Sequence, residues 1–149
     1  MSEIDQLPRI YLYRRIVQAK LFIAKNSTSN INLSIIAGEA FFSKFHFIRL
    51  FKKIYGKTPH QYLISVRIEN AKQLLQTKIS ISEVCMLIGF DSVSSFTGLF
   101  KRYTGLTPSQ YQLHQFRRQV QIQSTPLKFI PSCFAEQNGW KFSNFREEA

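Results

Sequence analysis

Two stretches of this 149-residue chain are near copies of each other, and this repeat constrains the fold more than any other feature. The stretches are FKKIYGKTPHQY at 51–62 and FKRYTGLTPSQY at 100–111, which are 49 residues apart. Each contains a basic pair, a glycine and a Thr-Pro-x-Gln sequence. A pattern that recurs at a distance indicates one structural unit built twice. The chain is therefore expected to contain two equivalent units.

The charge of the chain is strongly positive and unevenly distributed. Twenty Lys and Arg residues stand against nine Asp and Glu residues, which gives a net charge of +11 and an isoelectric point near 10.0. Residues 119–149 hold three basic and three acidic side chains, so the whole excess lies in residues 1–118. A polyanionic partner, either nucleic acid or an anionic membrane surface, is expected to bind this part of the chain.

The spacing of apolar residues predicts an all-α fold. Up to residue 118 these residues recur every three or four positions, and no segment alternates at period two for more than a few residues. About seven helices are expected, over residues 9–25, 32–40, 43–55, 59–78, 80–88, 92–104 and 108–118. Three predicted buried faces consist of Ile10, Tyr13, Ile16, Val17, Leu21 and Ala24; of Phe47, Leu50, Phe51 and Ile54; and of Phe96, Leu99, Phe100 and Tyr103.

The ends of the helices carry the same signals in both copies. Gly56 and Gly105 are suited to a left-handed turn that ends a helix. The sequences Thr-Pro-His-Gln at 58–61 and Thr-Pro-Ser-Gln at 107–110 each combine a capping box with proline at the first helical position. These signals predict that a helix stops and another starts at the same point of each unit.

Neither the cysteines nor the histidines indicate a disulfide, a metal site or a catalytic site. Cys85 and Cys133 lack a paired spacing and are expected to be packing residues in a reducing cytoplasm. His46, His60 and His114 lie far apart, with no cysteine or carboxylate at ligand spacing. No phosphate-binding glycine loop and no carboxylate pair for acid-base catalysis is present. The sequence therefore predicts no metal, no cofactor and no enzyme activity. Because no run approaches ~18 apolar residues, it also predicts no membrane span.

Each unit is expected to present the outer face of its second helix to a partner. A short helix, a tight turn and a second helix with cations, small polar groups and apolar groups outward is the arrangement of a helix-turn-helix reader of DNA. For a single such pair, ordinary packing helices are the better explanation. Two copies with the basic pair at the same place, in a chain of net charge +11, favour DNA binding.

The second unit carries the most specific pattern, I-x-x-V-C-x-x-x-G-F-D-S-x-S-S-F-x-x-L-F-K-R-x-x-G-x-T-P-x-x-Y from Ile81 to Tyr111. Together with the first unit at 33–63, it resembles the DNA-binding domain of the AraC/XylS family of bacterial transcription regulators. The resemblance covers roughly residues 31–118. It implies two homeodomain-like helix-turn-helix subdomains joined by a long helix, with recognition helices at 43–55 and 92–104.

The resemblance also implies how the chain is divided. The expected parts are an N-terminal helix with the first subdomain at 1–58, a linker helix at 59–78, a second subdomain at 79–118 and an irregular aromatic extension at 119–149. A linker helix of about 19 residues spans ~29 Å, near the ~34 Å repeat of B-DNA. The two recognition helices could then enter successive major grooves and read a bipartite site.

The family pattern assigns roles to residues on both recognition helices. Base contacts are expected from Phe45, Ile48 and Arg49, with Lys44 and His46 nearby, and from Val93, Ser94, Ser95 and Thr97. Phosphate contacts are expected from Ser43, Lys52, Lys53, Ser92, Lys101 and Arg102. Arg49 can contact guanine with two hydrogen bonds, and apolar side chains can contact thymine methyl groups. The alternatives are packing against the tail or a sensor domain for Phe45 and Ile48, and solvated surface charge for the cations.

Two residues depart from the family pattern. Gly98, the counterpart of Arg49, stands where the family often has an arginine that faces DNA. Phe41 stands where the first turn usually has glycine, so this turn is expected to be distorted. Because Gly98 takes the place of that arginine, the second recognition helix is expected to bind phosphates with little sequence discrimination.

The resemblance implies a sequence-specific transcription regulator that binds promoter double-stranded DNA and recruits RNA polymerase in the cytoplasm. The sensor or dimerisation domain usual in the family does not fit in the ~30 residues before the repeat. A stand-alone regulator and the DNA-binding fragment of a larger one both stay open. Two other functions on this scaffold also stay open: binding of a partner through the aromatic tail around Trp140, and DNA binding without sequence preference.

Overall fold

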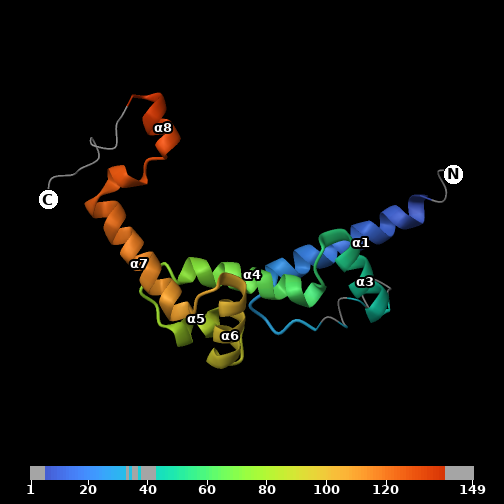
Figure 1. Ribbon diagram of the computed structural model, residues 1–149. Helices are drawn as coiled ribbons and strands as arrows, with labels where there is room; N and C mark the ends of the chain where they lie inside the picture. The colour runs from blue at the N-terminus through green and yellow to red at the C-terminus, as the bar shows by residue number, and fades with distance from the viewer. Residues whose placement is uncertain (1–5, 33, 35–36, 38–42, 140–149) are drawn as a thin grey trace.

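The computed structural model describes residues 6–32, 34, 37 and 43–139, and all of the regular secondary structure in these ranges is helical. The elements are α1 (Gln6–Lys25), α3 (Lys44–Tyr55), α4 (Pro59–Leu74), α5 (Ile81–Leu87), α6 (Val93–Thr104), α7 (Pro108–Ser124), the 3-10 helix η2 (Pro126–Phe129) and α8 (Ser132–Gln137). Figure 1 shows α4 between α1 and α3 at one end and α5 and α6 at the other, with α7 leading away. The all-α prediction is confirmed. Most of the expected helix at 32–40, Phe41, and Trp140 with the aromatic residues after it lie outside the described residues.

Two cores, one in each unit, hold the helices together. The first consists of the buried residues Ile16, Ala19, Ile23, Ala37, Phe47, Phe51 and Leu63. The second consists of Ile64, Ile68, Ala71, Leu75, Val84, Cys85, Ile88, Phe96 and Phe100. Neighbouring residues of α4 belong to different cores, since Leu63 packs in the first and Ile64 in the second. This helix therefore joins the two units through its own side chains.

The repeat in the sequence becomes a repeated aromatic contact in the structure. The ring centroids of Phe51 and Tyr62 are 5.9 Å apart in the first unit, and those of Phe100 and Tyr111 are 5.4 Å apart in the second. Each pair joins the second helix of a unit to the helix that follows it. Aromatic pairs at this separation contribute about 0.5–1.5 kcal/mol beyond the burial of their area.

The predicted stop and start signals are confirmed in both units. Gly56 and Gly105 have φ values of 71° and 80°, in the left-handed region that favours glycine. The Thr58 and Thr107 hydroxyls accept a hydrogen bond from the backbone N of the glutamine three residues later, at 3.2 and 3.3 Å. Each glutamine side chain accepts in return from the threonine N at 3.0 Å. The two turns are therefore fixed by the same local chemistry.

α1 buries a different face from the one that its sequence suggests. Its buried side chains are Ile16, Ala19 and Ile23. Four members of the expected buried face are exposed instead: Ile10, Tyr13, Val17 and Leu21. The prediction was wrong for these four because α1 carries apolar residues on both sides, so helical spacing alone does not identify the side that packs.

The last members of the two other predicted faces are also more exposed than expected. Ile54 and Tyr103, at equivalent positions in the last turns of α3 and α6, expose 38% and 42% of their surface. Tyr103 lines a groove together with the polar residues His60 and Gln61 at the start of α4. It faces the polar first turn of the linker helix, where a tyrosine hydroxyl can stay hydrated.

The linker helix ends earlier than the sequence suggests. α4 stops at Leu74, so its 16 residues span about 24 Å. Gln112 of α7 accounts for this end, because its Nε2 donates to the carbonyl oxygens of Thr77 and Ile79 at 3.0 and 2.8 Å. These hydrogen bonds hold the turn at residues 75–78 and the short connection from it to α5.

The C-terminal part of the described chain continues the last helix. α7 runs six residues beyond the expected residue 118, and only η2 and the short α8 follow it. Cys85 is buried in the second core as expected, whereas Cys133 at the start of α8 is exposed and packs in no core. The packing role predicted for Cys133 was therefore wrong.

Candidate nucleic-acid interface

The second helices of the two units, α3 and α6, carry the candidate DNA-binding residues. Each has 12 residues, starts after a serine N-cap and ends at a left-handed glycine. In the view of Figure 1, α3 lies at one end of α4 beneath α1, and α6 lies below the other end of α4 beside α5. Because each position of α3 corresponds to the position 49 residues later in α6, their faces can be compared residue by residue.

The outer face of α3 combines cations with an exposed aromatic ring. Phe45 exposes 75% of its surface, a large fraction for a residue type that is usually buried. Lys44, His46 and Arg49 are exposed as well. His46, Arg49 and Lys53 line a shallow hollow of about 180 Å³. Since residues four apart share a face of a helix, Phe45 and Arg49 are neighbours on this surface.

The predicted base contacts of Ile48 and Thr97 involve side chains that are only partly accessible. The two residues occupy equivalent positions and are both half-buried. Ile48 packs against the first core, so part of its apolar surface is already covered. Its contact with a base stays a prediction, with a smaller accessible area than the sequence suggests.

The N-terminus of α6 is held by its own serines. Ser92 Oγ accepts a hydrogen bond from the backbone N of Ser95 at 3.2 Å, and the two hydroxyl oxygens are 2.9 Å apart. Val93 and Ser94, between them, are exposed. Ser43 caps α3 in the same way by accepting from His46 N at 3.3 Å. The hydroxyl groups of Ser43, Ser92 and Ser95 would therefore contact DNA while they also take part in these capping hydrogen bonds.

Gly98 leaves open space in the middle of α6. It is exposed, and a Cβ added there would meet no atom within 4 Å beyond its chain neighbours and the nearby backbone of its own helix. The equivalent position of α3 carries the exposed Arg49. The second helix thus lacks a long donor at the position where the first helix has one.

Replacing Gly98 by alanine is expected to stabilise the fold. Glycine in a helix interior costs about 1 kcal/mol relative to alanine, and the new methyl group meets no neighbour. Chemical denaturation of Gly98→Ala should show a rise of about that size in the free energy of unfolding. Gly105→Ala is the control, because its φ of 80° makes the same change destabilising. A loss of stability in Gly98→Ala would contradict the open environment described for this position.

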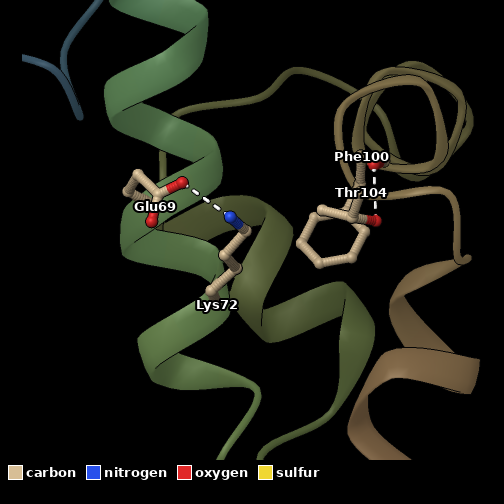
Figure 2. A network of polar contacts seen from close by, with 4 residues as sticks. All are labelled: Glu69, Lys72, Phe100 and Thr104. Carbon is tan, nitrogen blue, oxygen red and sulfur yellow. Dashed lines mark hydrogen bonds and ion pairs between the residues drawn. The ribbon is translucent and has the colours of Figure 1, made fainter.

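The basic pairs occupy the last turns of both helices. Lys52 and Lys53 in α3 and Lys101 and Arg102 in α6 are all exposed. The turn after this pair is secured in α6 by Thr104, whose hydroxyl lies 2.9 Å from the Phe100 carbonyl oxygen (Figure 2). Exposed cations on such turns suit phosphate contacts, which fix position and carry little sequence information.

Sequence reasoning missed Arg67, the one charged residue in the core of the described chain. It lies in the middle of α4 and exposes only 9% of its surface. Leu63, Ile64, Ile68 and Ala71 surround it in the sequence at helical spacing and are all buried. A cation within an apolar face of a predicted helix was therefore the available signal.

Other kinds of site find no support among the residues described. No group of three or more His, Cys, Asp or Glu side chains in this part of the chain could hold a metal ion. None of the described helices combines the length and the apolar character needed to cross a membrane.

Comparison with known proteins identifies the family. A family model described as a helix-turn-helix domain matches residues 36–121, more than half of the chain. The chain therefore belongs to the helix-turn-helix domain family of the AraC type.

Several bacterial regulators are similar in sequence. The probable transcriptional regulator LumQ of Photobacterium leiognathi is 37% identical over 92 residues, which cover 61% of this chain and 37% of LumQ. The HTH-type transcriptional activator AarP of Providencia stuartii is 36% identical over 94 residues, 62% of this chain and 70% of AarP. AdaA of Bacillus subtilis (strain 168), a bifunctional transcriptional activator and DNA repair enzyme, is 36% identical over 92 residues, 61% of this chain and 44% of AdaA. The chain thus spans less than half the length of LumQ and AdaA.

A solved structure with the same fold includes DNA. The DNA-binding domain of AdpA, a global transcriptional factor, in complex with a target DNA superposes with a TM-score of 0.67 at 28% identity. The match covers 71% of this chain and 96% of the AdpA domain. The two-unit architecture described above is therefore that of a DNA-binding domain of this family.

Proposed function

We propose that this protein is a sequence-specific DNA-binding transcription regulator of the AraC/XylS type, which binds a bipartite promoter site in double-stranded DNA. One observation carries the proposal: the same scaffold occurs twice, and each copy presents exposed cations on its second helix. The AdpA domain, which matches most of this chain, is in complex with a target DNA. The two second helices would enter successive major grooves of one duplex.

The two units have unequal roles in this proposal. Arg49 is exposed and can donate two hydrogen bonds to a guanine edge, which is worth about 1–3 kcal/mol of discrimination. Phe45 beside it offers apolar contact to a thymine methyl group. α6 has Gly98 instead of an arginine and only short side chains at Ser94 and Ser95. The first unit would therefore read sequence, while the second mainly contacts phosphates.

Replacing Arg49 by alanine is expected to relax the base preference at one position of the site. The lost guanine contact lowers affinity for the preferred duplex by about 1–3 kcal/mol and leaves affinity for a duplex changed at that base nearly unaltered. The measurement is selection of bound sites from a random duplex pool, followed by titration of both duplexes. Lys101→Ala is the matched comparison, because loss of a phosphate contact weakens binding to every sequence about equally.

The selection experiment separates the possible functions. Two motifs about one helical turn apart support the proposal, whereas binding with no enriched motif indicates DNA binding without sequence preference. An unchanged preferred sequence in Arg49→Ala would show that this helix is not the reading helix.

A second candidate function is supported by the exposed apolar face of α1. Ile10, Tyr13, Val17 and Leu21 lie along one side of this helix and are exposed by 46–63%. Such a face suits a protein partner, either a sensor domain or a second copy of the chain. The sequence left open the binding of a partner through the aromatic C-terminal tail. Of the tail residues that the structure describes, the aromatic side chains of Phe129 and Phe134 are exposed. RNA polymerase, implied by the family resemblance, is a further partner in the proposed function.

No reaction is part of the proposed function. The DNA repair activity named for AdaA is a property of that relative, of which this chain spans 44%. A regulator that acts on bacterial promoter DNA would work in the cytoplasm, where that DNA lies.

A further inference from the structure

A buried arginine of the linker helix binds the turn that follows α1. Arg67 Nε donates to the carbonyl oxygen of Ser27 at 2.6 Å, and its Nη2 donates to that of Ser29 at 2.9 Å. Asn70 Nδ2 lies 3.5 Å from the Ser27 hydroxyl. Ser27 is 3% exposed and Arg67 is 9% exposed, so water has little access to these contacts.

The second unit packs against the same turn. Gly89 approaches Thr28 so closely that an added Cβ would overlap the carbonyl oxygen of Thr28. The next residue, Phe90, places its ring centroid 5.5 Å from the Arg67 guanidinium carbon and 5.5 Å from the ring of Phe96 in α6. The turn after α1 therefore lies between α4 and the segment that leads into α6. We call this contact region, formed by residues 27–29, 67 and 89–90, the junction.

The chemistry of arginine makes the junction rigid. A guanidinium group presents its donors in a fixed plane, so two carbonyl oxygens bound by Nε and Nη2 are held in a defined arrangement relative to each other. Burial lowers the pKa of Arg67, and the nearby Asp91 opposes this effect. A buried charge that lost one of these partners would be poorly satisfied. The Arg67 side chain thus contacts both the turn at residues 27–29 of the first unit and the Phe90 ring of the second unit, and so fixes their relative position.

We propose that Arg67 is a positioning residue that sets the orientation of α6 relative to α3 and thereby the spacing between the two half-sites in DNA. The inference rests on the proposed function. Each base pair added between half-sites moves the second one by about 3.4 Å and rotates it by about 35° around the duplex. A fixed angle between the units therefore corresponds to one preferred spacing, and a loosened junction corresponds to several.

The experiment compares duplexes that differ only in half-site spacing. The full chain is titrated with the selected bipartite duplex, with versions one base pair longer and shorter, and with a duplex that holds only the first half-site. The variant is Arg67→Lys, which keeps the charge but cannot bind two carbonyls in the same plane. The control is Lys72→Arg, an exchange of the same two residue types on the same helix. Lys72 lies away from the junction and pairs with Glu69 at 2.7 Å (Figure 2).

We expect Arg67→Lys to lose about tenfold of the preference for the selected spacing over the spacing longer by one base pair. Its affinity for the single half-site should equal that of the wild type, which a general loss of structure would not allow. Lys72→Arg should behave as the wild type in every titration. An unchanged spacing preference in a folded Arg67→Lys would overturn the inference while leaving the proposed function intact.

Two further outcomes are decisive. If circular dichroism shows that Arg67→Lys is unfolded, Phe90→Leu replaces it, because this change removes the ring beside the guanidinium and keeps an apolar side chain. A wild-type spacing preference in Phe90→Leu then overturns the inference. A wild-type protein that binds no bipartite duplex at all overturns the proposed function, and the inference with it.

Discussion

Phe100→Ala is expected to lower the free energy of unfolding by about 3–5 kcal/mol, the usual cost of removing a buried phenylalanine ring. Phe100 is fully buried in the second core, and its ring contacts both Phe96 and Tyr111. The lost ring leaves a cavity in the second core, where α6 packs against α4 and α7. A loss of this size is a large part of the roughly 5–15 kcal/mol by which folded domains are stable. Urea denaturation followed by circular dichroism measures the change.

Phe51 and Phe45 provide matched comparisons for this prediction. Phe51 is the counterpart of Phe100 in the first core and is also fully buried, so Phe51→Ala should cost a similar amount. Phe45→Ala makes the same chemical change at a side chain that is 75% exposed, and it should alter stability by no more than about 0.5 kcal/mol. Equal stability losses in Phe45→Ala and Phe100→Ala would contradict the separation of core and outer face described for these helices.

DNA binding should weaken by roughly 150-fold when the salt concentration rises from 50 to 200 mM. Each phosphate neutralised by a cation contributes about −0.9 to the slope of log K against log salt concentration. The four exposed cations of the basic pairs, Lys52, Lys53, Lys101 and Arg102, then give a slope of about −3.6. Fluorescence anisotropy of a labelled duplex at several salt concentrations measures this slope.

Single substitutions test the assignment of these cations. Lys101→Ala should reduce the slope by about 0.9 because one fewer counterion is released. Lys72→Ala removes a partly exposed lysine of α4 that pairs with Glu69, and it should leave the slope unchanged. Affinity for DNA that does not depend on salt would contradict the phosphate contacts. A partner that binds the apolar face of α1 with little dependence on salt would instead support the second candidate function.

The repeated local signals were sufficient to predict most of the fold. Each capping box, left-handed glycine and phenylalanine pair involves residues only a few positions apart. The spacing of these residues in the sequence is therefore enough to predict their contacts in the structure. The same reasoning placed Phe45 and Arg49 on an outer face, where the structure exposes both. Their contacts with bases stay predictions.

Features that depend on contacts between distant segments could not be predicted. The face of α1 that is buried is decided by α3 and α4, and the sequence of α1 has apolar residues on both sides. The end of α4 depends on Gln112, which lies more than thirty residues later. Arg67 donates to carbonyl oxygens 38 and 40 residues earlier in the chain. The sequence around Arg67 does not identify these partners. The close approach of Thr28 to Gly89, which leaves no room for a side chain at residue 89, is likewise visible only in the folded chain.

The open space at Gly98 has a consequence for how this family member could acquire new target sequences. Most positions on a recognition helix are constrained, because a substitution that gains a base contact often disturbs packing or capping. At Gly98 any side chain enters solvent and almost any side chain favours the helix more than glycine does. A single mutation there could add a base contact without a loss of stability to compensate. Gly98 is therefore a position at which the second unit could gain base discrimination, so that both units and not only the first would read the DNA sequence.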